Sequence, residues 1–180
     1  MTFKGCRQSG IALLVSLIFL LMLSLTGLSS LQSATDQERK AGAVWFVNQS
    51  FQAAETALRQ GESQVQTQWP ALLACTSAAT CLPPSSARTQ TSPGPDPYSG
   101  VLWIPVADGL YGVQNLGAGV TPAQLPGITA ANFYRVTGIG LRGPSRTVLE
   151  SIFVRYQSEG TDVEKPAQQR FKRIMWRQLQ

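Results

Sequence analysis

Residues 11–31 read IALLVSLIFLLMLSLTGLSSL and contain no charged side chain. At a rise of about 1.5 Å per residue, a helix of this length reaches roughly 30 Å, the thickness of the hydrocarbon core of a bilayer. Residues 1–10 precede this segment and carry Lys4 and Arg7 but no acidic residue, which favours a cytoplasmic position for the leader. The order of these zones predicts a helix that can span a membrane, with the remainder of the chain beyond it.

Two simple explanations fit the apolar segment. A secretory signal would be cleaved after its apolar core, here near Ser30 to Ala34, but such a core is ordinarily shorter than this one. An uncleaved single-span anchor requires only the length and hydropathy that the segment has. Composition alone does not separate the two.

The junction at residues 7–11 reads RQSGI and resembles the recognition site of prepilin peptidase. The resemblance implies cleavage between Gly10 and Ile11, methylation of the new amino terminus at Ile11, and retention of the apolar segment for assembly. Most pilins carry glutamate as the fifth residue after cleavage, where this chain has Val15. Among pilin-like proteins this absence resembles subunits at or near a filament tip, and the alternative is a different cleavage site.

The resemblance continues downstream, where residues 51–60 read FQAAETALRQ and are similar to the alanine-rich segment of PilX-type minor pilins. Further similar segments are residues 36–42 (DQERKAG), 133–138 (FYRVTG), 148–155 (VLESIFVR) and 175–178 (MWRQ). The resemblance implies a type IV pilus subunit that contacts other minor and major pilins, a possible tip adhesin and the prepilin peptidase. It also implies an inner-membrane anchor with a periplasmic domain that later enters the pilus, with roles in adhesion and twitching motility.

Small or apolar residues also recur beyond the span at steps of three and four, the period of one helical face. They are Ala43, Val47, Phe51, Ala54, Leu58, Gly61, Val65 and Trp69. This pattern predicts that one helix runs from Ile11 to about Gln66. Glu55 and Arg59 lie four residues apart and are expected to pair, which is worth a few tenths of a kcal/mol.

The second half of the chain has short segments rich in β-branched and aromatic residues, which predict strands. They are residues 101–106, 110–113, 133–141, 147–157 and 171–178, with a hairpin turn at residues 141–147. Prolines among Ser, Thr and Gly indicate that residues 82–100 form a surface loop outside the core. The expected fold is therefore α+β, with a long N-terminal helix packed on a small antiparallel sheet. The expected segments are a leader (1–10), a membrane helix (11–31), an amphipathic helix (32–69) and a periplasmic domain (70–180).

Three cysteines are present, of which Cys6 lies in the leader. Cys75 and Cys81 are close enough in sequence to close a small loop, so we expect a disulfide between them. A metal site is the rival interpretation, but two thiols in a chain without histidine make an incomplete set of zinc ligands. We expect no cofactor and no metal.

Enzymatic function has little support in the sequence. The absence of histidine removes His-dependent nucleophilic catalysis, and no GxSxG, GxGxxG or P-loop pattern occurs. The acidic residues Asp96, Asp108, Glu150, Asp162 and Glu164 are scattered, as isolated surface acids would be. We therefore expect a role in assembly rather than in catalysis.

Nucleic-acid binding is not expected either. The formal net charge of +5 falls to +3 when Lys4 and Arg7 leave with the leader, so the mature chain is only mildly basic. A local cluster remains at Arg170, Lys172, Arg173 and Arg177, next to Phe171 and Trp176. Strict strand alternation would place Lys172, Ile174 and Trp176 on one face and Arg173 and Arg177 on the other. We expect this cluster to form a solvated strand edge, and the alternative is a docking or DNA-contacting patch.

Two alternatives to the pilus subunit remain open. A minor pseudopilin of a type II secretion system would share the leader, the apolar helix and the domain beyond it. A plain membrane-anchored binding module would keep its leader, so the N-terminus of the mature protein distinguishes this alternative from the filament subunits.

Overall fold

The structure is a computed structural model that describes residues 11–119, 131–157 and 168–179. The predicted leader, including Cys6 and Gly10, lies outside the described residues. The chain divides into two compact units, Met1–Val44 and Trp45–Gln180. We call the second unit the head.

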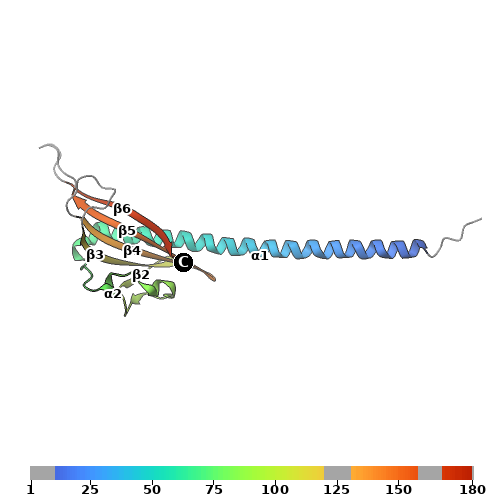
Figure 1. Ribbon diagram of the computed structural model, residues 1–180, viewed down its shortest axis with the longest axis horizontal. Coiled ribbons are helices and arrows are strands. Elements are labelled where there is room, and N and C mark those ends of the chain that lie inside the picture. The colour runs from blue at the N-terminus through green and yellow to red at the C-terminus, as the bar shows by residue number, and fades with distance from the viewer. Residues whose placement is uncertain (1–10, 120–130, 158–167, 180) are drawn as a thin grey trace, which may run out of the picture. The chain divides into compact units, whose positions relative to one another are not determined.

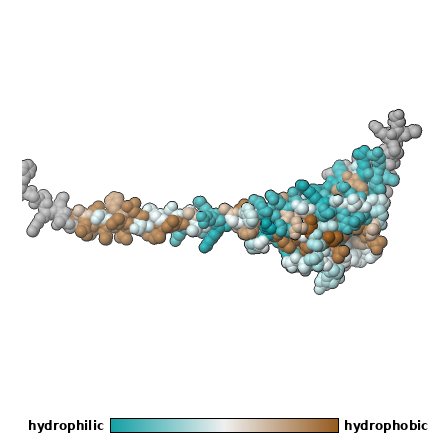
Figure 2. Space-filling view, turned by 180° about the vertical axis from the view of Figure 1, so that it is seen from behind, coloured by the Kyte–Doolittle hydropathy of each residue, from teal (hydrophilic) through white to brown (hydrophobic). Residues whose placement is uncertain are grey.

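One long helix, α1 (Ile11–Gln68), occupies the chain from the first described residue and ends two residues beyond the predicted end. In the first unit its large apolar side chains from Ile11 to Leu31 are all exposed. Figure 2 shows this part of α1 as a brown, apolar surface that is followed by a teal, hydrophilic band. In the sequence, the charged residues Asp36, Glu38, Arg39 and Lys40 follow the apolar segment.

The head contains one antiparallel sheet in which every strand pairs with its neighbour in sequence, in the order β1 to β6 (Figure 1). The strands are β1 (Gly94–Pro95), β2 (Leu102–Val106), β3 (Gly109–Gly119), β4 (Ala131–Arg142), β5 (Ser145–Gln157) and β6 (Gln169–Leu179). Three short helices, η1 (Trp69–Ala71), α2 (Ala78–Cys81) and η2 (Ser85–Arg88), lie between α1 and the sheet in sequence. The predicted α+β class is confirmed. The predicted hairpin is also confirmed, because β4 and β5 are joined at Arg142↔Ser145 with Gly143 at φ 53° in the turn.

The last turns of α1 cover one face of this sheet. Ala54, Leu58 and Val65 form a core cluster with residues of β4 and β5, namely Tyr134, Val136, Leu149 and Phe153. The predicted helical face is correct there but wrong at Ala43 and Val47, which are both exposed. They precede Ser50, the first buried residue of α1. The buried face also includes polar Ser50, whose hydroxyl lies 2.8 Å from the Thr147 hydroxyl, and polar Glu62. The apolar period missed these two residues because their burial depends on partners in the sheet.

The other face of the sheet is covered by the segment between α1 and β2. Side chains alternate between the two faces of a strand, so Ile139 and Val148 lie opposite the α1-facing Val136 and Leu149. Ile139 and Val148 pack in a second core cluster with Ala87, Val101, Trp103 and Leu110. The prediction that residues 82–100 lie outside the core is therefore wrong at Ala87, which is fully buried. The segment is anchored because Arg146 of β5 donates hydrogen bonds to the carbonyls of Ala87, Thr89 and Gln90.

Strand β6 departs from strict alternation. Its pairing with β5 shifts by one residue at Ile174, between the pairs Ile152↔Met175 and Phe153↔Arg173. This bulge places Trp176 on the α1 face, where its ring lies 6.2 Å from that of Phe51. The predicted alternation along β6 is thus wrong, because Arg173 and Arg177 do not share a face of the sheet. Arg173 bonds Glu62 of α1, whereas Arg177 bonds Glu150 on the opposite face. The predicted grouping of Lys172, Ile174 and Trp176 on one face fails for the same reason.

Candidate assembly helix and disulfide-closed loop

The N-terminal part of α1 is the first candidate site. Within the described residues, one helix is long and apolar enough to cross a membrane, and it starts at Ile11. Three of its hydroxyl groups are satisfied within the helix, since Ser16, Ser24 and Thr26 donate to carbonyls three or four residues earlier. Ile11 is exposed in the first turn. Val15 presents an exposed aliphatic side chain at the position where most pilins carry glutamate. The segment therefore offers a largely apolar surface without charged residues to lipid or to other helices.

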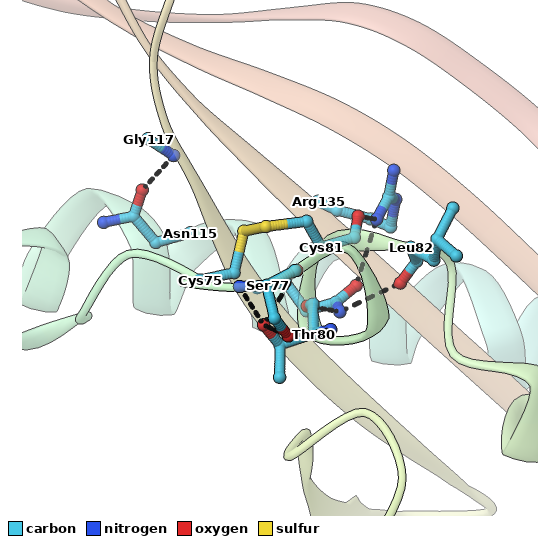
Figure 3. The surroundings of a disulfide bond; sticks show 9 residues. Cys75, Ser77, Thr80, Cys81, Leu82, Asn115, Gly117 and Arg135 are labelled. Atoms are coloured by element: carbon cyan, nitrogen blue, oxygen red, sulfur yellow. Dashed lines mark hydrogen bonds between the residues drawn. A yellow bond between two sulfur atoms is a disulfide. The ribbon is translucent and has the colours of Figure 1, made fainter.

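The second candidate site is the loop closed by Cys75 and Cys81, which are joined by a disulfide with a Cα to Cα distance of 5.4 Å (Figure 3). The loop contains α2, whose N-terminus is held by a capping box between Ser77 and Thr80. The capping box fixes the direction in which α2 enters the loop. The disulfide then fixes its end at Cys81.

Side chains of the sheet hold this loop in place (Figure 3). Gln114 of β3 donates from Nε2 to the carbonyls of Thr80, at 2.6 Å, and Leu82, at 3.1 Å. Arg135 of β4 donates to the carbonyl of Cys81 between them. These donors satisfy carbonyls at the end of α2 that have no partner within the helix. The sequence carries no signal for the roles of Gln114 and Arg135, because the backbone carbonyls that they bind lie more than 30 residues away.

Arg135 also connects the loop to a buried acid. Its Nε lies 3.3 Å from Oε2 of Glu150, although the angle is not that of a hydrogen bond, and Glu150 has no exposed surface. Arg177 of β6 pairs with the other oxygen of Glu150 at 2.7 Å. Burial lowers the pKa of Arg135, the charge of Glu150 opposes that shift, and the charge of Arg177 adds to it. The sequence-based reading of Glu150 as an isolated surface acid is therefore wrong.

A second acid joins α1 to the edge of the sheet. Glu62 accepts hydrogen bonds from Arg173 Nε at 2.7 Å and Nη2 at 2.6 Å, and from the Ser151 hydroxyl at 2.7 Å. The bidentate hydrogen bond from Arg173 to Glu62 raises the pKa of the guanidinium, and burial opposes the shift. The C-terminal arginines Arg173 and Arg177 are thus partners of buried acids, and both are also exposed on the edge strand β6.

Within residues 11–119, 131–157 and 168–179, no group of three or more His, Cys, Asp or Glu side chains is arranged to hold a metal ion. Cys75 and Cys81 bond to each other in the structure.

These features define a class of protein: an α+β head that follows a helix apolar enough to enter a membrane. Residues 9–59 match the family model described as PilX N-terminal. This segment is therefore of the PilX type, and it indicates a minor pilin of the type IV pilus with an N-terminal hydrophobic helix. No curated protein and no solved structure matches the chain. The match includes the Gly10–Ile11 junction and ends before the disulfide-closed loop and the sheet.

Replacing both Cys75 and Cys81 with serine is expected to lower the free energy of unfolding of the head by about 2 kcal/mol, at the low end for a disulfide because the loop is short. Urea unfolding of the full chain in detergent, followed by tryptophan fluorescence, measures this. Reduction of the unmodified protein should increase its intact mass by two hydrogen atoms. Cys6→Ser is the matched control and should leave the unfolding midpoint unchanged. A free thiol at Cys75 or Cys81 in the purified protein would contradict the expected bridge.

Proposed function

We propose that this chain is a minor pilin that primes assembly of a type IV pilus, or sits at its tip, through its N-terminal hydrophobic helix. The observation that carries the proposal is the exposed apolar part of α1 within a segment that matches the PilX N-terminal family. Exposed apolar surface of this extent requires either lipid or protein around it, since water would disfavour it by about 25 cal/mol for each Å². A filament provides protein, and the membrane provides lipid before assembly.

The proposed sequence of events follows from these two environments. The basic leader keeps the N-terminus in the cytoplasm, and prepilin peptidase cleaves after Gly10 and methylates Ile11. Residues 11–31 hold the subunit in the inner membrane, with the head in the periplasm. Extraction from lipid exposes the same surface, so it becomes favourable only when residues 11–31 pack against the helices of other pilins.

Val15 supports a position at the end of the filament. In filament subunits a glutamate at this position is thought to neutralise the amine at the N-terminus of a neighbouring subunit, and such a pairing is strong in an apolar environment. Residues 11–31 contain no carboxylate, so this chain does not offer that partner. A subunit at the tip has no need of it.

The N-terminus of the mature protein tests this proposal. Mass analysis of protein from cells that make pili should show a chain that begins at methylated Ile11, and Gly10→Val should leave the precursor with its leader and abolish its recovery in sheared pili. The matched control is Gly42→Ala, because a Cβ at Gly42 would meet nothing within 4 Å. Mature protein that still begins at Met1 and never appears in sheared pili would refute the proposal and favour a plain membrane anchor.

A further inference from the structure

The head exposes large apolar side chains on one segment. In the described residues outside α1, five such side chains are exposed, and four of them lie within residues 73–102. These four are Leu73, which is 90% exposed, Tyr98, which is 81% exposed, Leu82 and Leu102. Single exposed apolar residues are ordinary on a protein surface, but several in one segment suggest an interaction site.

Two of these leucines line a groove where the sheet is incomplete. The pairing of β2 with β3 ends at Ile104↔Tyr111, and the next bridge described along that edge of β3 joins Asn115 to Ala74. Between these two pairings lies a groove of about 400 Å³ lined by Leu73, Leu102 and Val113, among others. Its size suits one large apolar side chain with the backbone that carries it.

The walls of the groove carry no charge. None of its lining residues is Asp, Glu, Lys or Arg, and the whole stretch of residues 70–107 contains only Arg88 and Asp96 as charged residues. Asp96 is buried, and it accepts hydrogen bonds from the hydroxyls of Ser86 and Ser99 and from the backbone N–H of Tyr98. Depletion of charge together with apolar side chains is typical of the core of a protein interface. The complementary surface is one that is neutral as well.

The groove is also held in a fixed shape. The Cys75–Cys81 disulfide closes one wall, and Asn115 of β3 donates to the carbonyl of Leu72 at 2.7 Å while accepting from the N–H of Cys75 at 2.8 Å. Gln114 and Arg135 fix the far end of the same loop. A binding surface that is already ordered loses little conformational entropy on association, which favours affinity.

We propose that this groove, with Leu73 and Leu102 on its rim, docks the head of a different pilin subunit of the same filament, which inserts an uncharged apolar side chain. The inference rests on the proposed function, because it takes its partner from the same filament. The absence of lysine and arginine from the lining argues against an anionic lipid headgroup or a nucleic acid, both of which require positive charge. Because no ion pair contributes, the contact is insensitive to ionic strength.

The test places a photo-crosslinking amino acid at Leu73 or at Leu102 of the full chain, in cells that make pili. The matched control position is Gln178, an exposed residue of β6 at the opposite edge of the sheet. Irradiation should give the same adduct from Leu73 and Leu102 but not from Gln178, and mass spectrometry should identify the partner as a different pilin subunit. The adduct yield from isolated membranes should be the same in low and in high salt.

A charge in the groove should remove the contact. Leu102→Asp should lower the adduct yield from position 73 by about tenfold or more, since burying a leucine is worth about 1.5 to 3 kcal/mol and a factor of ten corresponds to 1.4 kcal/mol. Gln178→Asp is the matched control and should leave the yield unchanged. An intact mass equal to that calculated for each variant with the disulfide formed, together with an unchanged unfolding midpoint, shows that the variants are folded.

Several results would overturn this inference. They are no adduct from either leucine, an adduct with a second copy of this chain or with a protein that is not a pilin, and a yield that falls steeply with salt. Each of them leaves the proposed function standing if the mature protein begins at methylated Ile11 and is recovered in sheared pili. Conversely, loss of that processing refutes the proposed function whatever the crosslinks show.

Discussion

Glu150→Ala should destabilise the head by about 3 to 5 kcal/mol, the usual cost of removing one partner from a buried ion pair. The carboxylate is fully buried and is the shared partner of Arg135 and Arg177. Without it, Arg135, whose side chain is only 12% exposed, keeps a positive charge with no acid beside it. Urea unfolding of the full chain in detergent measures the loss.

The matched control for this change is Glu55→Ala. Glu55 and Arg59 form the predicted pair at 3.4 Å, but Arg59 is mostly exposed. Exposed pairs of this kind contribute about 0.3 to 0.5 kcal/mol, so the control should barely move the unfolding midpoint. Equal effects of the two substitutions would show that the burial of Glu150 does not matter for stability.

Gly140→Ala is expected to destabilise the head by about 3 kcal/mol, at the upper end of the range for overpacked cores. A Cβ at Gly140 would overlap the carbonyl oxygen of Ser50 and the amide of Ala54, both of which are backbone atoms of α1. One added at Gly138 would lie 2.6 Å from the carbonyl oxygen of Ala54. Because a helix backbone cannot rotate away as a side chain can, α1 has to move off the sheet.

Unfolding of the full chain in urea again provides the measurement, and Gly42→Ala provides the control with the same chemical change in open space. Alanine is favoured over glycine in a helix by about 1 kcal/mol, so Gly42→Ala should not destabilise the protein. If Gly140→Ala were as stable as the unmodified protein, the close approach of α1 to β4 would be wrong.

The elements that the sequence predicted well are those whose signal is local. The charge-free run of residues 11–31 and the period of Ala54, Leu58 and Val65 specify α1 without any knowledge of the sheet. Strands β4 and β5 and the turn at Gly143 follow from short apolar segments separated by turn residues. The boundaries were less exact, since β3 extends to Gly119, well beyond the predicted residue 113.

The candidate sites divide in the same way. The cleavage junction, Ile11 and Val15 are matters of sequence, and they stay predictions about processing and assembly. The pair Cys75 and Cys81 was proposed from a spacing of six residues and is bonded in the structure. The side chains that hold the loop, Gln114, Asn115 and Arg135, had no signal in the sequence, because each acts on a backbone atom brought close only by folding.

The sequence by itself determined the apolar surface of residues 11–31, the helical period after it and the alternation of the strands. These features follow from hydropathy and turn chemistry, which depend on neighbours along the chain. Only the tertiary structure decided that Glu62 and Glu150 are buried with arginines of β6, that Ala87 enters the core, and that Ile174 forms a bulge. These outcomes depend on which residues meet across the sheet. A charge is stable in the interior only where such a partner is present, and one-dimensional patterns carry no record of that partner.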